Sequence, residues 1–242
     1  MSNLRLDEAM ASRGLVNSRS QAESYIKLKN VRVNNKLNIK PETRVSVKDK
    51  IEIIASEQFV SRAGLKLASV VGKLNIEFKD KTILDVGSST GGFTDYSIKR
   101  GADKVIAVEL GSDQMHADLR SNPKIELHEQ CDIRDFKKPK TPIDIVLIDV
   151  SFTSLRTILP AIYQLASDKT EVLAMFKPQF EADSTMKNKG IIKNNNIRRN
   201  LIKEFEQWLR QNNFYIIKSV DSEITGSKGN LERFFLLKKI LS

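Results

Sequence analysis

The sequence predicts a small α+β module followed by a larger α/β domain, whose sheet is mostly parallel with an antiparallel edge strand. From residue 83 onward, apolar β-branched runs alternate with helical patterns, which is typical of a parallel sheet covered by helices. A glycine-rich turn directly follows the first of these runs. The beginning of the chain instead holds two short helical patterns and several very short strands. We therefore divide the chain into a module at 1–57, a linker at 58–61 and a domain at 62–242.

The N-terminal module is expected to begin with two helices. Apolar residues from Leu4 to Met10 recur at helical spacing, and Gly14 follows as a C-cap. Ser18 is the expected N-cap of a second helix over Arg19–Lys27. Short alternating runs predict strands at 31–33, 45–47 and 51–54, with a polar turn at 34–36.

Basic side chains are abundant in this module and in the chain as a whole. The chain has 40 Lys and Arg against 30 Asp and Glu, a net charge of +10, which favours a polyanionic partner. Arg19 and Lys27 lie on one face of the predicted helix, two turns apart, and such a face can follow a phosphate backbone. An ordinary solvated helix face is the alternative interpretation.

The order of residues in the module resembles the S-four-type RNA-binding domain, a family named after a ribosomal protein. The resemblance covers Arg5-Leu6-Asp7, Gly14-Leu15, Ser18-Arg19, Ala22 and Val31-Arg32-Val33-Asn34. The chain departs from the family at Lys29 and Asn35, where glycine is usual, and lysine adopts a left-handed turn less readily than asparagine. The resemblance implies RNA binding, with contacts expected from Arg5, Ser18, Arg19, Lys27, Arg32 and Arg62.

The larger domain is expected to open with a helix in the segment that starts at Phe59. Helices are predicted at 92–99, 153–165 and 197–210, and Trp208 in the last of them is expected to anchor the core. A polar segment at 181–196 is expected to be a loop that moves or closes over a substrate. Strands are predicted at 83–86, 105–108, 124–128, 143–152, 171–176, 214–217 and 233–237.

The turn after the first of these strands carries the clearest ligand signal. Its glycines let a ligand approach the backbone where a Cβ atom would collide. The spacing is neither that of a dinucleotide fingerprint nor that of a P-loop, because Phe93 follows Gly92. The pattern D-x-G-x-x-x-G-G-F resembles the cofactor loop of S-adenosylmethionine-dependent methyltransferases. A glycine-rich turn without a ligand is the alternative.

Acidic residues after the next two strands complete the expected cofactor site. Glu109 ends the second strand, where a carboxylate can accept hydrogen bonds from ribose hydroxyls. Asp132 follows the third strand and can accept from an adenine amino group, with Ile133 packed on the ring. The expected S-adenosyl-L-methionine contacts are Asp85, Gly87, Ser88, Ser89, Gly91, Gly92, Phe93, Glu109, Leu110, Asp132, Ile133 and Asp149.

Segments along the whole chain resemble the TlyA family, RNA methyltransferases often labelled haemolysins. These segments are Val60-Ser61-Arg62, Asp149-Val150-Ser151-Phe152, Ser154-Leu155-Arg156, Lys177-Pro178-Gln179-Phe180-Glu181, Thr225-Gly226 and Gly229-Asn230. In that family an S-four-like domain precedes an FtsJ-like domain with a Rossmann-like class I methyltransferase sheet. The resemblance implies 2′-O-methylation of ribose, typically of cytidine, in ribosomal RNA or ribosomal subunits. It also implies a catalytic tetrad at Lys66, Asp149, Lys177 and Glu232, with Glu223 as a competitor for the last role.

These residue types suit the implied reaction. A ribose 2′-hydroxyl is a poor nucleophile, so an enzyme has to align it with the methyl group and assist the loss of its proton. We expect Lys177 to contact the 2′-oxygen as base or orienting group, without a metal. An ion-pair network that only joins the strand ends is the alternative.

Composition excludes several other classes of protein. A single cysteine, Cys131, and two isolated histidines, His116 and His128, give no metal-binding cluster, and no apolar run is long enough to span a membrane. We expect a cytoplasmic protein. Two alternative functions are a non-catalytic RNA-binding or ribosome-assembly protein and, less favoured, a membrane-active haemolysin.

Base methylation is disfavoured because Asp-Val-Ser-Phe stands where base-nitrogen methyltransferases commonly have an Asn/Asp-Pro-Pro-aromatic loop after the fourth strand.

Overall fold

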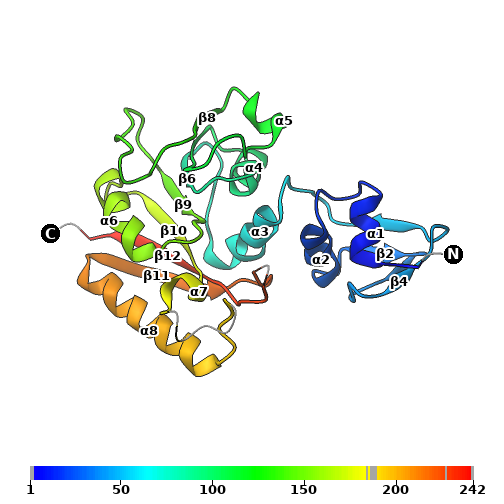
Figure 1. Ribbon diagram of the computed structural model, residues 1–242. Coiled ribbons are helices and arrows are strands. Elements are labelled where there is room, and N and C mark those ends of the chain that lie inside the picture. The colour runs from blue at the N-terminus through cyan, green and yellow to red at the C-terminus, as the bar shows by residue number, and fades with distance from the viewer. Residues whose placement is uncertain (1–2, 184, 186–189, 227, 241–242) are drawn as a thin grey trace.

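The computed structural model describes residues 3–183, 185, 190–226 and 228–240, and Figure 1 shows a small N-terminal part beside a larger one. The small part contains β1 (Leu4–Arg5), α1 (Leu6–Ser12), α2 (Arg19–Lys27), β2 (Val31–Val33), β3 (Lys36–Leu37), β4 (Arg44–Val45) and β5 (Ile51–Ile53). The larger part contains α3 (Arg62–Leu74), β6 (Thr82–Val86), α4 (Gly92–Lys99), β7 (Lys104–Val108), α5 (Ala117–Arg120), β8 (Ile125–His128), β9 (Ile145–Ile148), α6 (Leu155–Leu165), β10 (Glu171–Phe176), α7 (Pro178–Glu181), α8 (Asn195–Gln211), β11 (Phe214–Asp221) and β12 (Arg233–Lys239).

The larger part is built on a seven-stranded sheet with the order β11-β12-β10-β9-β6-β7-β8. Strands β10, β9, β6, β7 and β8 are paired in parallel, whereas β12 runs antiparallel to both β10 and β11. The strand order reverses beside β6, and the crevice at such a switch point is where open α/β sheets bind ligands.

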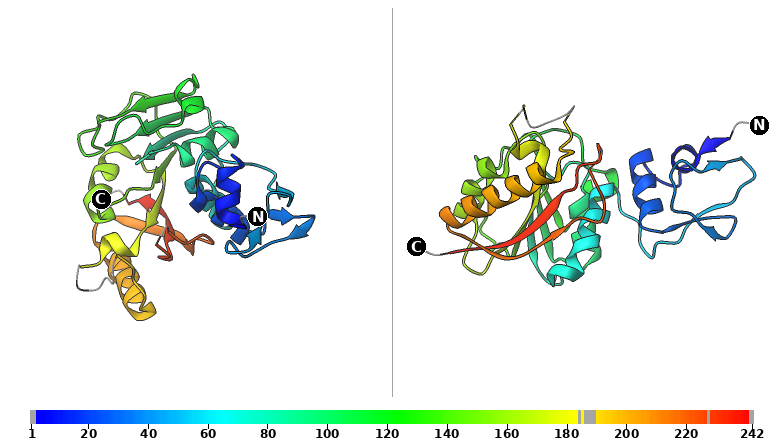
Figure 2. Two further views of the ribbon diagram at one scale, coloured as in Figure 1. Left: turned by 45° about the vertical axis from the view of Figure 1, so that its right-hand side comes forward. Right: turned by 90° about the horizontal axis from the view of Figure 1, so that it is seen from below.

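Helices cover both faces of this sheet, which explains why its central strands are apolar throughout. Every residue of β6 and of β9 is buried. Helices α3 and α4 contribute to one apolar cluster, and α6 and α8 contribute to the cluster on the opposite face. Figure 2 shows α8 and α3 on opposite sides of the sheet. A strand covered by helices on both faces has no side exposed to water, so its residues are apolar throughout instead of alternating between apolar and polar. The sequence pattern predicted such strands.

The small part is an α+β unit whose local conformations follow its turn residues. Strands β3, β2 and β5 form one antiparallel sheet, and β1 pairs with β4. The hydroxyl of Ser18 accepts a hydrogen bond from the backbone N–H of Gln21 and caps α2. Lys29 and Asn35 both adopt left-handed backbone conformations, with φ of 62° and 67°. The two positions where glycine is usual therefore keep their turn geometry without it.

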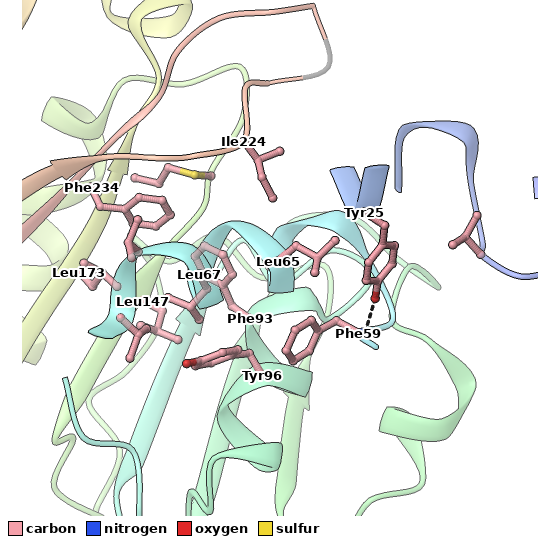
Figure 3. Packing of buried hydrophobic residues seen from close by; sticks show 14 of the residues in the cluster. Tyr25, Phe59, Leu65, Leu67, Phe93, Tyr96, Leu147, Leu173, Ile224 and Phe234 are labelled. Atoms are coloured by element: carbon pink, nitrogen blue, oxygen red, sulfur yellow. Dashed lines mark hydrogen bonds between the residues drawn. The ribbon is translucent and has the colours of Figure 1, made fainter. Parts of the chain in front are cut away.

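The two parts meet at the segment that leads into α3. The side-chain amide of Gln21 donates to the carbonyl of Phe59 over 2.6 Å, and the hydroxyl of Tyr25 accepts from the N–H of Phe59. Figure 3 shows Tyr25 and Phe59 at the end of an apolar cluster that continues through Phe93 to Phe234. The core of the larger part therefore extends to α2.

Most predicted elements lie where the sequence placed them, and α2, α4 and β10 match residue for residue. Three predicted elements differ clearly, and most of the others shift by only one or two residues at an end. Leu4–Arg5 forms a strand with Arg44–Val45 instead of extending α1. Strand β9 ends at Ile148 because the chain then turns away, and Phe152 adopts φ of 65°. Strand β11 extends to Asp221 because it stays paired with β12 beyond a bulge.

Candidate active site

The carboxyl ends of β6, β9 and β10 open into one cavity of about 800 Å³. The glycine turn after β6, the segment after β9 and the turn after β10 each contribute to its walls. The beginning of α3, the N-terminal end of α2 and the segment before β12 also contribute to the lining. The predicted residues that line it are Ser18, Arg62, Lys66, Asp85, Gly87, Ser88, Ser89, Gly92, Phe93, Asp149, Lys177 and Glu232.

The four residues of the expected tetrad form two ion pairs in this cavity. Lys177 Nζ lies 2.6 Å from Asp149 Oδ1, and Lys66 is paired with Glu232. Only 5% of Lys66, 7% of Lys177 and 2% of Glu232 is exposed, so these charges are held with little access to water. The competing Glu223 is exposed and pairs with Lys73 outside the cavity lining. The geometry therefore favours Glu232.

The turn after β6 requires glycine at two positions that shape the cavity. Gly87 has φ of 78°, a left-handed conformation, and a Cβ there would lie 3.0 Å from the carbonyl oxygen of Asp149. A Cβ on Gly92 would lie 2.2 Å from Ser61 Oγ. A side chain at either position would therefore collide with the residues that follow β9 or with those that begin α3.

Asp85 lies buried at the base of the cavity. Its Oδ2 accepts a hydrogen bond from the hydroxyl of Thr94 over 2.6 Å, whereas its Oδ1 has no hydrogen-bond partner in the described part of the chain. Burial raises the pKa of Asp85 to about 7, Asp149 and Glu109 add to this effect, and the hydrogen bond from Thr94 opposes it. An unpaired buried oxygen is costly, so this atom is placed to accept a hydrogen bond from a ligand.

Glu109 lies beside the cavity and is connected to it through Ser89. The carboxylate accepts hydrogen bonds from the backbone N–H groups of Ser89, over 2.9 Å, and Gly111, over 2.8 Å. Gln114, which the sequence analysis did not single out, accepts from the hydroxyl of Ser89 and also lies 3.4 Å from Glu109. Its position in an irregular segment gives no pattern that could have marked it.

The remaining expected cofactor residues occupy different surroundings. Asp132 is bound by the side chain and backbone of Arg134, and these hydrogen bonds lower the pKa of Asp132 below its usual value. Ile133 is buried, whereas 69% of Leu110 is exposed. These three residues and Gly91 lie outside the lining of the cavity, although backbone hydrogen bonds connect the segments after β7 and β8.

Two of the six expected RNA contacts bind a buried carboxylate, although 49% of the Arg19 side chain is still exposed. Arg5 donates two hydrogen bonds to Asp7, and Arg19 donates one to the same carboxylate and pairs with Glu8. Burial alone would raise the pKa of Asp7, but the two arginines hold it below its usual value. Lys27 and Arg32 are exposed. Arg5 and Arg19 therefore stabilise α1 and α2, which limits their freedom to bind phosphate.

Two residues after β9 were quoted only as part of a motif, but the structure places both at the cavity. Ser151 Oγ accepts a hydrogen bond from Lys177 Nζ over 2.9 Å. Phe152 is 93% exposed, lines the cavity and lies 5.3 Å from the ring of Phe180, centroid to centroid. A large exposed aromatic ring in a left-handed conformation is unusual.

Metal-binding clusters and membrane-spanning helices are both absent from the described ranges. Among these residues, no group of three or more His, Cys, Asp and Glu side chains is arranged to hold a metal ion. None of the helices in the same ranges is long and apolar enough to cross a bilayer.

The polar segment 181–196, expected to be a loop, is described only in part, because residues 184 and 186–189 lie outside the described residues. In its second half, Gly190 and Ile192 are both hydrogen-bonded to the side chain of Asn230.

Comparison with known proteins agrees with this geometry. Residues 59–239 match the FtsJ-like methyltransferase family, and residues 4–51 match the S4 domain. The chain belongs to the TlyA/haemolysin family of FtsJ-like methyltransferases. It is 38% identical over 184 residues to the 23S rRNA (cytidine-2′-O)-methyltransferase TlyA of Campylobacter jejuni, covering 75% of this chain and 72% of that protein. It is also 33% identical to Hemolysin A of Brachyspira hyodysenteriae, covering 95% and 97% of the two chains.

A solved structure shows the same fold over the full length. A hemolysin-family protein from Streptococcus thermophilus superposes with a TM-score of 0.75 at 30% identity, covering all of this chain and 90% of the other. The expected fold, a methyltransferase sheet preceded by a small α+β module, is thereby confirmed. Membership of an S-adenosylmethionine-dependent family also makes S-adenosyl-L-methionine the implied co-substrate.

Proposed function

We propose that this chain transfers a methyl group from S-adenosyl-L-methionine to the 2′-hydroxyl of a ribose in ribosomal RNA. The observation that carries this proposal is the pairing of Lys177 with Asp149 and of Lys66 with Glu232 in the cavity that the glycine turn also lines. Two buried lysines and two carboxylates beside such a turn suit proton removal from an alcohol. A base-nitrogen methyltransferase would not need this set.

The residues around the glycine turn fit S-adenosyl-L-methionine. Asp85 Oδ1 is buried, unpaired within the described chain and at the base of the cavity, where it can accept from the ammonium group of the methionine part. Gly87 and Gly92 leave the backbone open to close approach. Glu109 lies beside Ser89, where it can accept from the ribose hydroxyls. Asp132 would serve the adenine amino group only if it turned away from Arg134.

The tetrad would act on the substrate hydroxyl. When bound, the cofactor supplies a methyl group on a positively charged sulfur. Lys177 would contact the 2′-oxygen and hold it in line with that methyl group. As the oxygen–methyl bond forms and the sulfur–methyl bond breaks, the hydroxyl proton would pass to the Lys177–Asp149 pair and then to water. Lys66 and Glu232 would fix the position of this pair and balance its charge.

The RNA would approach between the two parts of the chain. Ser18 on the S4 side and Arg62 on the methyltransferase side both line the cavity, and Lys228 lines it from a third segment. The exposed face of Phe152 offers a surface on which the base of the target nucleotide could stack. We infer that residues 1–57 bind RNA, that 58–61 is a linker and that 62–242 catalyses transfer. Relatives named as rRNA (cytidine-2′-O)-methyltransferases support cytidine as the target. A ribosomal substrate would in turn place the protein in the cytoplasm.

Transfer of labelled methyl groups tests the proposal. Ribosomal subunits that lack the modification are incubated with the full chain and S-adenosyl-L-methionine labelled in the methyl group, and the RNA is then hydrolysed in alkali. Methylation of a ribose 2′-oxygen blocks alkaline cleavage, so we expect the label in an alkali-resistant dinucleotide. Label in mononucleotides, where a methylated base would remain after alkaline cleavage, would refute ribose methylation. Tight RNA binding without any transfer would favour the non-catalytic assembly protein.

A further inference from the structure

The catalytic pair Lys177–Asp149 is carried by two separate segments of the chain. Asp149 follows β9 and Lys177 follows β10. These strands are parallel neighbours, paired from Ile145 with Glu171 to Ile148 with Ala174. Their backbone pairing ends before either catalytic residue is reached, so other contacts have to fix the distance between the two side chains.

Side-chain hydrogen bonds at two places join these segments. At the cavity, Ser151 Oγ accepts from Lys177 Nζ over 2.9 Å. Farther along, Glu181 accepts from the hydroxyl of Ser154 over 2.5 Å and from the N–H of Leu155 over 2.7 Å. Ser154 also caps α6. The two contacts therefore lie on either side of the turn that carries Phe152.

Glu181 is an unusual residue to use as a simple helix cap. Burial raises the pKa of Glu181 above its usual value, and the hydrogen bonds from Ser154 and Leu155 and the charge of Arg156 oppose this shift. The carboxylate does not line the cavity. Its two acceptor oxygens bind two adjacent donors on the other segment, which fixes both its distance and its direction.

We propose that Ser151 and Glu181 are positioning residues for methyl transfer, which together hold the segment 149–155 against the segment 177–181. Ser151 directs the amine of Lys177, and Glu181 keeps the two segments in register. This inference rests on the proposed function. A misplacement of about 1 Å at a reacting group can cost about a hundredfold in rate, so the loss of either contact lowers turnover without removing any group that touches the substrate.

Variants at both positions, with a matched control, test the proposal. Glu181→Ala removes an acceptor of two hydrogen bonds after the carboxyl end of β10. The control Thr170→Val removes a buried hydroxyl that makes three hydrogen bonds, one to the carbonyl of Ile143 and two to Ser167, just before the amino end of the same strand. We expect Ser151→Ala and Glu181→Ala to lower kcat by about ten- to a hundredfold. The Kd for S-adenosyl-L-methionine and the KM for RNA stay within about twofold of wild type.

The conservative variant and the control separate positioning from stability. Glu181→Gln can still accept from Leu155 and bond to Ser154, so it restores most of kcat. Thr170→Val lowers the Tm but leaves kcat unchanged. Wild-type kcat in both Ser151→Ala and Glu181→Ala would overturn the inference, as would an equal loss of kcat in Thr170→Val at a matched Tm.

A second readout does not depend on methyl transfer. Lys177 is 7% exposed, so an amine-reactive reagent should label it slowly in the wild type, as followed by mass spectrometry of the peptide. We expect faster labelling of Lys177 in Ser151→Ala and Glu181→Ala, and an unchanged rate in Thr170→Val. A wild-type rate of Lys177 labelling in both Ser151→Ala and Glu181→Ala would overturn the inference. Absence of transfer by the wild type would instead refute the proposed function alone.

Discussion

Asp85→Asn tests how the fold holds a carboxylate at the base of the cavity. Asp85 has a folded pKa of about 7 against an ordinary value of 3.8, chiefly because it is buried. The folded protein therefore binds a proton between these two values where the unfolded chain does not. Since the folded pKa is the higher one, the free energy of unfolding falls as the pH rises from about 4 to about 7 and is constant above that range.

The size of the effect follows from the pKa difference. About three pKa units at about 1.36 kcal/mol each amount to about 4 kcal/mol at pH 8. Asparagine carries no charge and can still accept the hydrogen bond from Thr94. We therefore expect Asp85→Asn to be more stable than wild type by up to about 4 kcal/mol at pH 8 and by less than about 1 kcal/mol at pH 4.

Thermal unfolding of the cofactor-free protein at pH 4 and pH 8 measures this difference. A gain of about 4 kcal/mol corresponds to a rise in Tm of about 8–16 °C for a chain of this size. The same variant should bind S-adenosyl-L-methionine about ten- to a hundredfold more weakly at pH 8, because a charge-assisted hydrogen bond to its ammonium is lost. An equal gain in stability at both pH values, or unchanged cofactor affinity, would refute this role for Asp85.

Three further substitutions test the tetrad, the glycine turn and the RNA surface. Lys66→Met leaves Glu232 as an unpaired buried charge, so we expect no transfer and a loss of about 3–5 kcal/mol in the free energy of unfolding. Gly92→Ala places a Cβ 2.2 Å from a hydroxyl oxygen and should destabilise the protein by about 1–3 kcal/mol while weakening cofactor binding. Its control, Gly72→Ala, meets nothing within 4 Å and should stabilise α3 by about 0.5–1 kcal/mol. Arg32→Ala should weaken RNA binding and reduce the slope of log K against log salt by about one, with no change in Tm.

Each of these expectations has a clear contrary result. Full stability of Lys66→Met would show that Glu232 is not held as a charge. Cofactor binding by Gly92→Ala at wild-type affinity would mean that no ligand approaches this backbone. Unaltered RNA affinity in Arg32→Ala would place the RNA on another face of the S4 part.

Local sequence was sufficient for the elements whose ends are fixed by local chemistry. Ser18 caps α2, Gly91 and Gly92 start α4, and Pro178 ends β10, so these boundaries could be predicted to the residue. The proximity of Asp149 and Lys177 could be predicted because each follows one of two neighbouring parallel strands, whereas Lys66 and Glu232 were expected only from the family motif. Trp208 stacks against Phe205 on α8, as expected of a core anchor.

The features that escaped prediction depend on contacts between distant segments. Leu4–Arg5 becomes a strand only because Arg44–Val45 lies beside it. The partners of Arg5 and Arg19 could not be foreseen, because the charge pattern does not reveal that Asp7 is buried between them. Gln114 and Glu181 make hydrogen bonds to residues far along the chain or across a loop, and no periodicity marks such contacts.

The most direct measurement is single-turnover transfer of labelled methyl groups to unmodified ribosomal subunits by wild type and Lys177→Ala. The control is Lys73→Ala, which removes an exposed lysine that also pairs with a glutamate. We expect label on ribose from wild type and Lys73→Ala, a loss of at least about a hundredfold in Lys177→Ala, and the same Kd for S-adenosyl-L-methionine in all three. Transfer by Lys177→Ala at the wild-type rate would contradict the assignment of the Lys177–Asp149 pair as the catalytic centre.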